Sequence, residues 1–167
     1  METTTSQNNK AAFESLFNEY ADVVYRLCLY KVSNKAVAED LTQETFLRLW
    51  KMMSGGANID KPKSYIFQIA RNLIIDHYKS AKSLSLDSLQ EDGFDPKSEE
   101  VAVDTLSDIS LLRKTIESLE ADYQEVVYLR YVEGYRVKEI AEMLDISENL
   151  AAVRINRAVN KLREKFP

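Results

Sequence analysis

Residues 123–166 decide the fold of this chain, and they read YQEVVYLRYVEGYRVKEIAEMLDISENLAAVRINRAVNKLREKF. This stretch predicts three short helices separated by sharp corners. The first helix ends before Gly134, a typical position for the glycine that follows a helix. Its apolar residues recur at helical spacing and are Val126, Val127, Leu129 and Tyr131.

A tight corner is predicted at Asp145-Ile146-Ser147, between the second and third helices of this stretch. Ser147 is a suitable N-cap, because its hydroxyl can accept a hydrogen bond from a backbone amide one turn later. Ala141 places a small side chain where the next helix approaches. The predicted inner face of the second helix consists of Val137, Ile140, Ala141 and Leu144.

The third helix has an apolar stripe and a face rich in basic and amide groups. The stripe is Ala151, Ile155, Ala158 and Leu162, and the polar face carries Asn149, Arg154, Asn156, Arg157, Asn160 and Lys161. Arginine and asparagine can hydrogen-bond base edges and phosphates in the major groove. Corner, cap and basic face together predict a DNA-binding helix-turn-helix. The alternative is the end of a helical bundle with a solvated polar face.

The composition favours an all-α protein that is not an enzyme. The chain has 167 residues, 45% of them hydrophobic, with four glycines and three prolines. Cys28 is the only cysteine, which excludes an internal disulfide and a cysteine-based zinc site. Cys28 falls in a predicted apolar stripe, so we interpret it as a small core residue rather than a reactive thiol. No catalytic constellation is present, and we expect no cofactor, no metal and no small-molecule substrate.

The N-terminal METTTSQNNK has no apolar segment, and no run of residues approaches membrane-spanning length. We therefore expect no membrane insertion and a cytoplasmic location.

Negative charge is concentrated in the middle of the chain. The formal net charge is −5, but residues 81–112 hold two basic and eight acidic residues. In contrast, residues 61–82 hold five basic and one acidic, and residues 146–167 five basic and two acidic. Two modest basic patches predict weak autonomous DNA affinity, since each neutralised phosphate adds a salt-dependent increment. We therefore expect a partner to assist binding.

The N-terminal half predicts two helices, about 10–32 and about 35–52, the second capped by Ser33 or Asn34. The second buries Ala38, Leu41, Thr45, Phe46 and Leu49, and a neighbouring face carries Asp40, Gln43, Glu44, Leu47 and Trp50. Acidic and amide groups edged by apolar side chains favour a protein-docking surface. The alternative is surface charge beside a half-buried tryptophan.

A Gly55-Gly56 loop precedes a third predicted helix, about 61–81. It buries Ile66, Ile69, Ala70, Leu73 and Ile74 or His77, and exposes Arg71, Asn72, Asp76, Lys79 and Lys82, with Tyr65 near its start. Aromatic, basic and amide groups beside a flexible loop are suited to the capture of unpaired bases. A solvated amphipathic helix would have the same pattern.

We predict two small helical domains joined by an acidic linker: a three-helix domain at 10–82, the linker at 83–103, and a four-helix domain at 104–166 with the helix-turn-helix. The linker is rich in Ser, Asp and Glu. A helix of about 104–118 leads into the opening stretch.

Three segments in order resemble regions 2 and 4 of the extracytoplasmic-function sigma factors of the sigma-70 family. They are AEDLTQETFLRLW (38–50), SYIFQIARNLIIDHYKSAK (64–82) and residues 123–164. The resemblance implies a protein that binds core RNA polymerase and directs promoter recognition and transcription initiation. It also implies an anti-sigma factor as a partner.

The resemblance assigns three sets of residues. Asp40, Gln43, Glu44 and Leu47 would dock on the clamp coiled coil of the polymerase, and the helix before the helix-turn-helix would meet its flap. A base flipped out of the minus-ten element would be held by Gly55, Gly56, Ala57, Asn58, Ile59, Ile69 and Asn72, with Tyr65 where the family usually has Trp, and Arg71, Lys79 and Lys82 on phosphates. The minus-thirty-five element would be read by Asn149, Ala152, Val153, Arg154, Asn156, Arg157 and Lys161.

The chain departs from the family pattern at several positions. Asp145 stands where Gly is common, and Ala152, Val159 and Asn160 stand where basic residues are frequent. Fewer cations imply weaker phosphate anchoring. Glu120-Ala121 replaces the usual Leu-Pro before the helix, which should soften that boundary.

Two other functions are compatible with parts of this pattern. A stand-alone helix-turn-helix repressor or activator would need a dimer interface and palindromic sites. A helical protein-binding adaptor would use the polar helix face on a partner protein.

Overall fold

The computed structural model describes residues 2–88 and 114–165, and all regular elements in these ranges are helical. The chain divides into two compact units, Met1–Ser98 and Glu99–Pro167. The prediction of an all-α protein with two helical domains is therefore confirmed. The domain boundaries at 82, 83–103 and 104 stay predictions. None of the described helices has the length and apolar character needed to cross a membrane.

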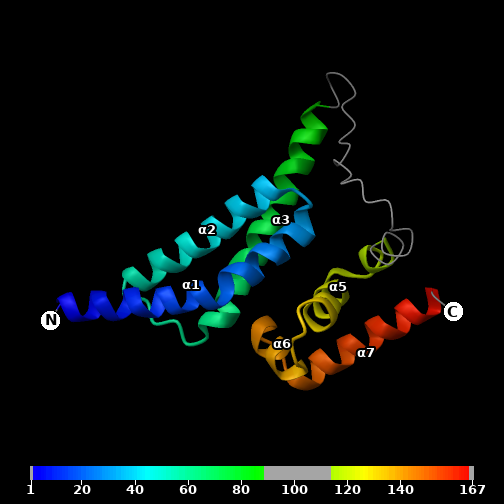
Figure 1. Cartoon of the computed structure of the whole chain (residues 1–167). Coiled ribbons are helices and arrows are strands. Elements are labelled where there is room, and N and C mark those ends of the chain that lie inside the picture. The colour runs from blue at the N-terminus through cyan, green and yellow to red at the C-terminus, as the bar shows by residue number, and fades with distance from the viewer. Residues whose placement is uncertain (1, 89–113, 166–167) are drawn as a thin grey trace. The chain divides into compact units, whose positions relative to one another are not determined.

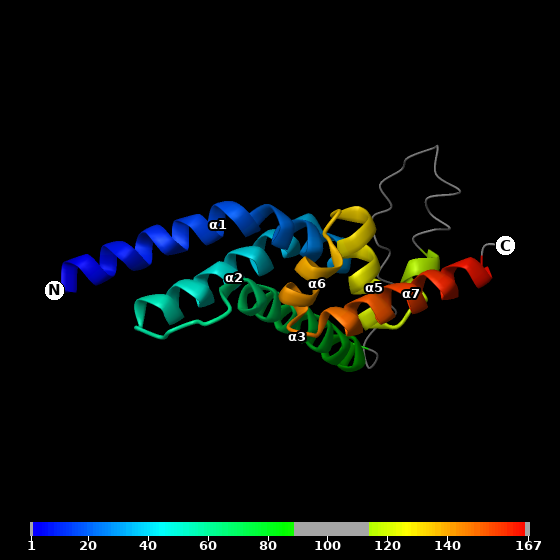
Figure 2. The same cartoon turned by 90° about the horizontal axis from the view of Figure 1, so that it is seen from below.

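The first unit is built from three long helices that lie side by side (Figures 1 and 2). They are α1 (Glu2–Val32), α2 (Lys35–Ser54) and α3 (Pro62–Ser88). Val24, Leu27 and Cys28 of α1 are buried against a core that also includes Ala38, Phe46, Leu49, Ile66, Phe67, Ile69, Ala70, Leu73 and Ile74. Most of the stripes predicted from helical spacing therefore face inward. Phe67 was absent from the predicted stripe although it is fully buried.

Two of these helices extend beyond their predicted limits. α1 begins at Glu2 rather than about Lys10. Its early part is tied to α2, because the Nδ2 of Asn9 donates to the backbone oxygen of Met53 at 3.0 Å. α3 ends at Ser88, so residues 83–88 continue the helix although they were assigned to the linker. The first glycine after the predicted end is Gly93, so no helix-breaking residue precedes Ser88. Residues 89–103 lie outside the described ranges.

The start of α2 is determined locally. Of the two predicted capping residues, Asn34 is the N-cap, and its Oδ1 accepts from the backbone N–H of Val37 at 3.0 Å. Ser33 instead has a positive φ of 52° and forms the turn between α1 and α2.

Cys28 is fully buried in the core of the first unit, as its place in the stripe predicted. Burial raises the pKa of its thiol from 9.0 to about 11, against a smaller lowering effect of a hydrogen bond with the Thr42 side chain. A thiol with this pKa remains protonated and unreactive near neutral pH.

The raised pKa of Cys28 predicts a loss of stability in alkali. Between pH 9 and about 11 the folded protein keeps a thiol proton that the unfolded chain releases, so stability is full below this window and falls as the pH rises through it. Urea unfolding of the wild type and of Cys28→Ala over this range measures the effect. The wild type should lose more stability with pH than Cys28→Ala. Equal pH dependence of the two proteins would contradict the prediction.

The second unit contains α5 (Ala121–Val127), a π-helical segment η1 (Tyr128–Val132), α6 (Val137–Leu144) and α7 (Glu148–Lys165). Residues 114–117 are also helical; the rest of the helix predicted from about 104 lies outside the described ranges. Leu119, Val127 and Ala158 form a buried cluster with Ile116, Tyr123 and Leu162 packed against it. This cluster joins α5 to the C-terminal half of α7.

The π-helical segment changes which aromatic residue is buried. Tyr131, predicted on the apolar stripe, is 61% exposed, while Tyr128 is buried and donates to Oε1 of Glu133 at 2.8 Å. A π-turn adds a residue to the helical turn and so rotates everything after it. The prediction for Tyr131 is therefore wrong. Gly134, with a φ of +77°, ends the segment as predicted.

Candidate nucleic-acid interface

The predicted helix-turn-helix corner is present between α6 and α7. Asp145 has φ 52° and ψ 48°, the left-handed conformation that Asp tolerates better than most residues. The backbone N–H of Ile146 donates to the oxygen of Ala141 at 3.0 Å, which closes the end of α6. Ser147 caps α7, since its Oγ accepts from the backbone N–H of Leu150 at 3.1 Å. The corner thus fixes where α7 begins.

α7 packs through its predicted apolar stripe and leaves an opposite face in solvent. Ala151, Ile155 and Ala158 are buried, and Asn149, Asn156 and Arg157 are exposed. Ala152 and Val153 are half-buried, and Asn160, whose amide lies on the same side by helical spacing, is exposed. We call Asn149, Asn156, Arg157 and Asn160 the outer face of α7. It carries the amide and guanidinium groups that can hydrogen-bond base edges.

Arg154 and Lys161, also predicted to contact DNA, lie on a different side of α7. The Nη2 of Arg154 is 2.9 Å from Oδ2 of Asp122, and the Arg154 side chain is only 24% exposed. The Nζ of Lys161 is 3.0 Å from Oε1 of Glu120 and 4.7 Å from the centre of the Tyr123 ring. Both cations therefore face the beginning of α5. Spacing within α7 alone could not reveal these partners, which lie 32 and 41 residues earlier in the chain.

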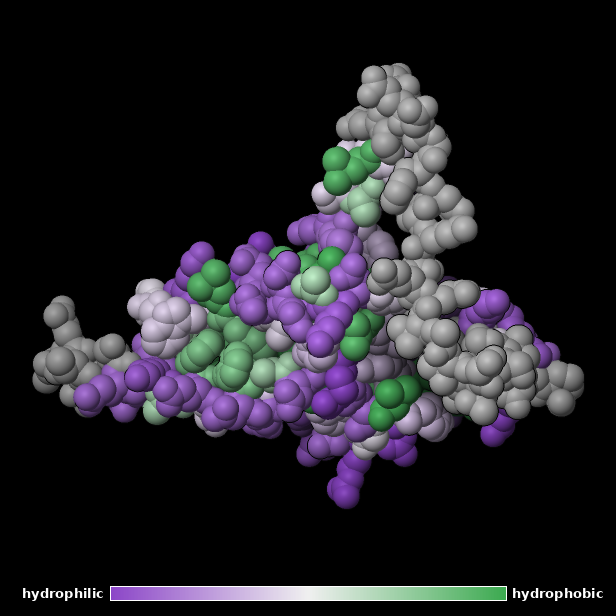
Figure 3. Space-filling view, turned by 45° about the horizontal axis from the view of Figure 1, so that its top comes forward, coloured by the Kyte–Doolittle hydropathy of each residue, from purple (hydrophilic) through white to green (hydrophobic). Residues whose placement is uncertain are grey.

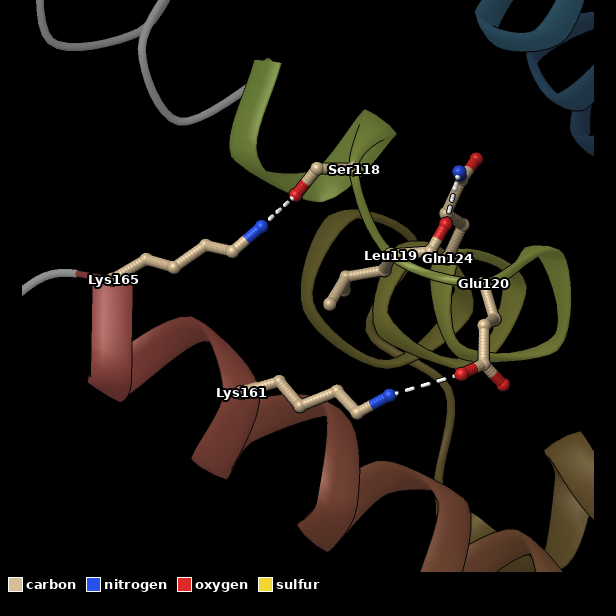
Figure 4. A network of polar contacts seen from close by, with 6 residues as sticks. All are labelled: Ser118, Leu119, Glu120, Gln124, Lys161 and Lys165. Carbon is tan, nitrogen blue, oxygen red and sulfur yellow. Dashed lines mark hydrogen bonds and ion pairs between the residues drawn. The ribbon is translucent and has the colours of Figure 1, made fainter.

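Side-chain hydrogen bonds are present at the start of α5, the helix boundary that Glu120-Ala121 was expected to soften. Gln124 donates from Nε2 to the backbone oxygens of Leu119 at 2.7 Å and Glu117 at 2.9 Å. Lys161, on α7, donates a hydrogen bond from Nζ to Oε1 of Glu120 at 3.0 Å (Figure 4). The expectation that this start of α5 would be soft is therefore not supported by its contacts.

In the first unit, the loop between α2 and α3 presents most of the residues predicted to surround an unpaired base. Gly55, Gly56, Ala57 and Asn58 are exposed, and Ile59 is half-buried. Gly56 has a φ of +79°, which glycine adopts without strain. The Nδ2 of Asn58 donates to Oδ1 of Asp60 at 3.3 Å, a contact within the loop.

The α3 residues predicted to bind DNA lie on two sides of the helix. Tyr65, Asn72 and Lys79 recur every seven residues and share one side; Tyr65 is half-buried and the other two are exposed. Arg71, half-buried, and Lys82, exposed, are rotated away from that line. Ile69 is only 6% exposed and belongs to the core, as its stripe predicted.

The acidic residues of α2 border an aromatic cluster formed with α1. Asp40 and Gln43 are exposed and Leu47 is 45% exposed, while Oε1 of Glu44 accepts from Nε of Arg48 at 2.7 Å. The rings of Phe13 and Trp50 have centroids 5.2 Å apart, and those of Phe17 and Phe46 4.9 Å apart. Hydrophobic surface gathers over α1 and α2 in Figure 3. The face combines charge, amide and exposed apolar area, which is typical of a protein-binding surface.

Comparisons with known proteins match both units. The family model of Sigma-70 region 2 matches residues 16–84, and that of Sigma-70 region 4 matches residues 109–162. Among relatives, the ECF RNA polymerase sigma factor BldN of Streptomyces coelicolor is 33% identical over 93% of this chain and 61% of its own length. The ECF RNA polymerase sigma factor SigL of Mycobacterium tuberculosis is 31% identical over 92% of this chain and 88% of its own.

A solved structure shows the same fold. The sigma factor RpoE from Bartonella quintana, in complex with the anti-sigma factor NepR, superimposes with a TM-score of 0.58 at 23% identity, covering 92% of this chain and 95% of that one. Fold and sequence together define a two-domain protein of the sigma-70 class. The chain belongs to the extracytoplasmic-function RNA polymerase sigma factors.

Proposed function

We propose that this protein binds core RNA polymerase and directs it to a small set of promoters as an alternative sigma factor. The observation that carries the proposal is the outer face of α7, which follows a closed, capped corner and presents amide and guanidinium groups to solvent. It performs no covalent chemistry, and it acts in the cytoplasm with the polymerase.

The second unit is proposed to read the minus-thirty-five element. Asn149, Asn156 and Arg157 contact base edges or phosphates, and Ala152 and Val153 offer apolar contact at the edges of the same surface. Arg154 and Lys161 can contact DNA only when their ion pairs with Asp122 and Glu120 break. The exposed Tyr131 and Val132 give η1 an apolar surface that can meet the polymerase flap.

The first unit is proposed to hold an unpaired base of the minus-ten element. The exposed loop from Gly55 to Ile59 supplies the backbone around the base, and Asn72 supplies an amide. Lys79, Lys82 and Arg71 neutralise phosphates. Stacking on a half-buried Tyr65 repays part of the cost of melting the duplex. Because Ile69 is in the core, it supports the packing of α3 rather than contacting the base.

The acidic and aromatic face of α2 is proposed to dock on the clamp coiled coil of the polymerase. Asp40, Gln43 and Glu44 pair with basic residues there, and Leu47 packs beside them. An anti-sigma factor that covers this protein until induction is a further proposed partner, and the Bartonella complex supports it by analogy of fold.

Reconstitution tests the proposed function directly. Pull-down of core polymerase, followed by run-off transcription from start sites enriched by sequencing, should show binding and promoter-dependent initiation. A stand-alone repressor would instead behave as a DNA-binding dimer in gel filtration and ignore the polymerase. Absence of both polymerase binding and initiation would refute the proposal.

Removal of the outer face should separate a promoter reader from a protein adaptor. Asn156→Ala with Arg157→Ala is expected to lower run-off transcription at least about thirtyfold, since two lost base contacts at about 1–3 kcal/mol each amount to about 2 kcal/mol or more. Polymerase pull-down should be unchanged. Glu19→Ala with Asp22→Ala, two exposed residues of α1 in the other unit, is the control. Full transcription by the outer-face variant would favour the adaptor.

A further inference from the structure

Two basic side chains of α7 contact the segment that leads into α5 (Figure 4), and a third contacts α5 itself. Lys161 is paired with Glu120 at 3.0 Å, and Lys165 donates to the hydroxyl of Ser118. About two turns before Lys161, Arg154 is paired with Asp122 at 2.9 Å. We call Glu120 and Asp122 the acidic pair.

Helical spacing explains why these cations do not belong to the outer face. Arg154, Lys161 and Lys165 recur at intervals of seven and four residues, so they lie along one line of α7. That line borders the buried stripe on the side where α5 packs. Arg157, three residues after Arg154, lies off this line and is exposed on the outer face. α7 therefore carries a line of engaged cations and a separate outer face.

The acidic pair contributes little to the stability of the fold. The side chains of Asp122 and Glu120 are 63% and 72% exposed, and water screens ion pairs at such positions. The α5–α7 packing is instead provided by the cluster around Leu119, Val127 and Ala158. A larger effect of the two carboxylates is expected when a polyanion approaches α7, because they then compete with phosphates for the same cations.

We propose that Glu120 and Asp122 limit the affinity of α7 for DNA by holding Lys161 and Arg154 away from DNA phosphates. This inference rests on the proposed binding of promoter DNA by α7. Phosphate contacts carry no sequence information, whereas the amides and Arg157 of the outer face do. When Glu120 and Asp122 occupy these two cations, affinity for all DNA is lower, and the choice between DNA sequences is made by the outer face. The sigma factor then depends on the polymerase for stable binding, and spends less time on non-promoter DNA.

The test is a salt titration of DNA binding by full-length Glu120→Gln/Asp122→Asn. Fluorescence anisotropy is measured with a promoter duplex and with a scrambled duplex of equal length. The variant should bind both duplexes more tightly at low salt, and by similar factors, because phosphate contacts do not depend on sequence. Two released cations add about 1.8 to the slope of log affinity against log salt. Over a fourfold rise in salt the variant should therefore lose about tenfold more affinity than the wild type.

Matched variants separate this effect from charge alone. Glu19→Gln/Asp22→Asn changes the net charge equally at exposed positions of α1, in the other unit. Circular dichroism confirms helical content, and the single variants Glu120→Gln and Asp122→Asn should each give about half the slope change. A slope equal to wild type, an equal gain in the control, or no DNA binding by any variant overturns the inference. Weaker binding also overturns it, since the acidic pair would then orient the cations for DNA.

Failure of the proposed function gives a different result. If the wild type ignores polymerase and starts no transcription, but the variant still gains salt-dependent DNA affinity, the role of the acidic pair holds and the sigma function fails.

Discussion

Reversing the charge of Asp40 and Glu44 to lysine is expected to lower affinity for core polymerase at least about a hundredfold. Like charges placed across an interface cost several kcal/mol, and each 1.4 kcal/mol is about tenfold in affinity. Both side chains lie at the surface of α2, and Oε1 of Glu44 accepts a hydrogen bond from Arg48 of the same helix. The fold should therefore survive the change, and pull-down or anisotropy with core polymerase measures the loss.

A matched charge reversal on α1 is the control for this prediction. Glu19 and Asp22 are exposed and, by helical spacing, lie on the opposite side of α1 from Phe13 and Phe17. Glu19→Lys/Asp22→Lys makes the same change in net charge and should keep wild-type affinity. If both double variants lose affinity equally, the attraction is a general charge effect. If neither does, the α2 face is not the docking surface.

Truncation of Phe67 to alanine is expected to destabilise the first unit by about 3–5 kcal/mol. Phe67 is fully buried, and its ring meets that of Tyr20 edge-on with centroids 6.1 Å apart. Alanine leaves a cavity between α1 and α3 that rigid helices fill only in part. Urea unfolding followed by circular dichroism should show an earlier transition for the first unit, while the second unit keeps its own.

Phe17→Ala provides the comparison for Phe67. Its side chain is 43% exposed and has ring contacts with Phe13 and Phe46. Loss of these contacts should cost about 1 kcal/mol. A loss for Phe67→Ala no larger than for Phe17→Ala would show that the core has collapsed onto the vacated space or that Phe67 is not central to it.

Local sequence predicted the features that depend on neighbours in the chain. The cap at Asn34 (one of the two predicted candidates), the left-handed Asp145, the cap at Ser147 and the glycine at 134 each depend on groups within a few residues. The inward stripe of α7 followed from spacing alone, because an α-helix turns by a fixed angle per residue. For the candidate site, this was enough to place Asn149, Asn156 and Arg157 in solvent.

Tertiary structure decided which of the outward groups remain available. The same spacing that exposes Arg157 offered no way to foresee that Arg154 and Lys161 meet Asp122 and Glu120. Likewise, spacing did not reveal the π-turn, after which Tyr131 is exposed, or the burial of Phe67 against the other helices of the first unit. The sequence alone determined the existence of these helices, the capped starts of α2 and α7 and the helix-turn-helix corner, because hydrogen bonds and steric limits act over single turns. The partners of each charge were set only when α5 and α7 packed together, because such pairs join residues far apart in the chain.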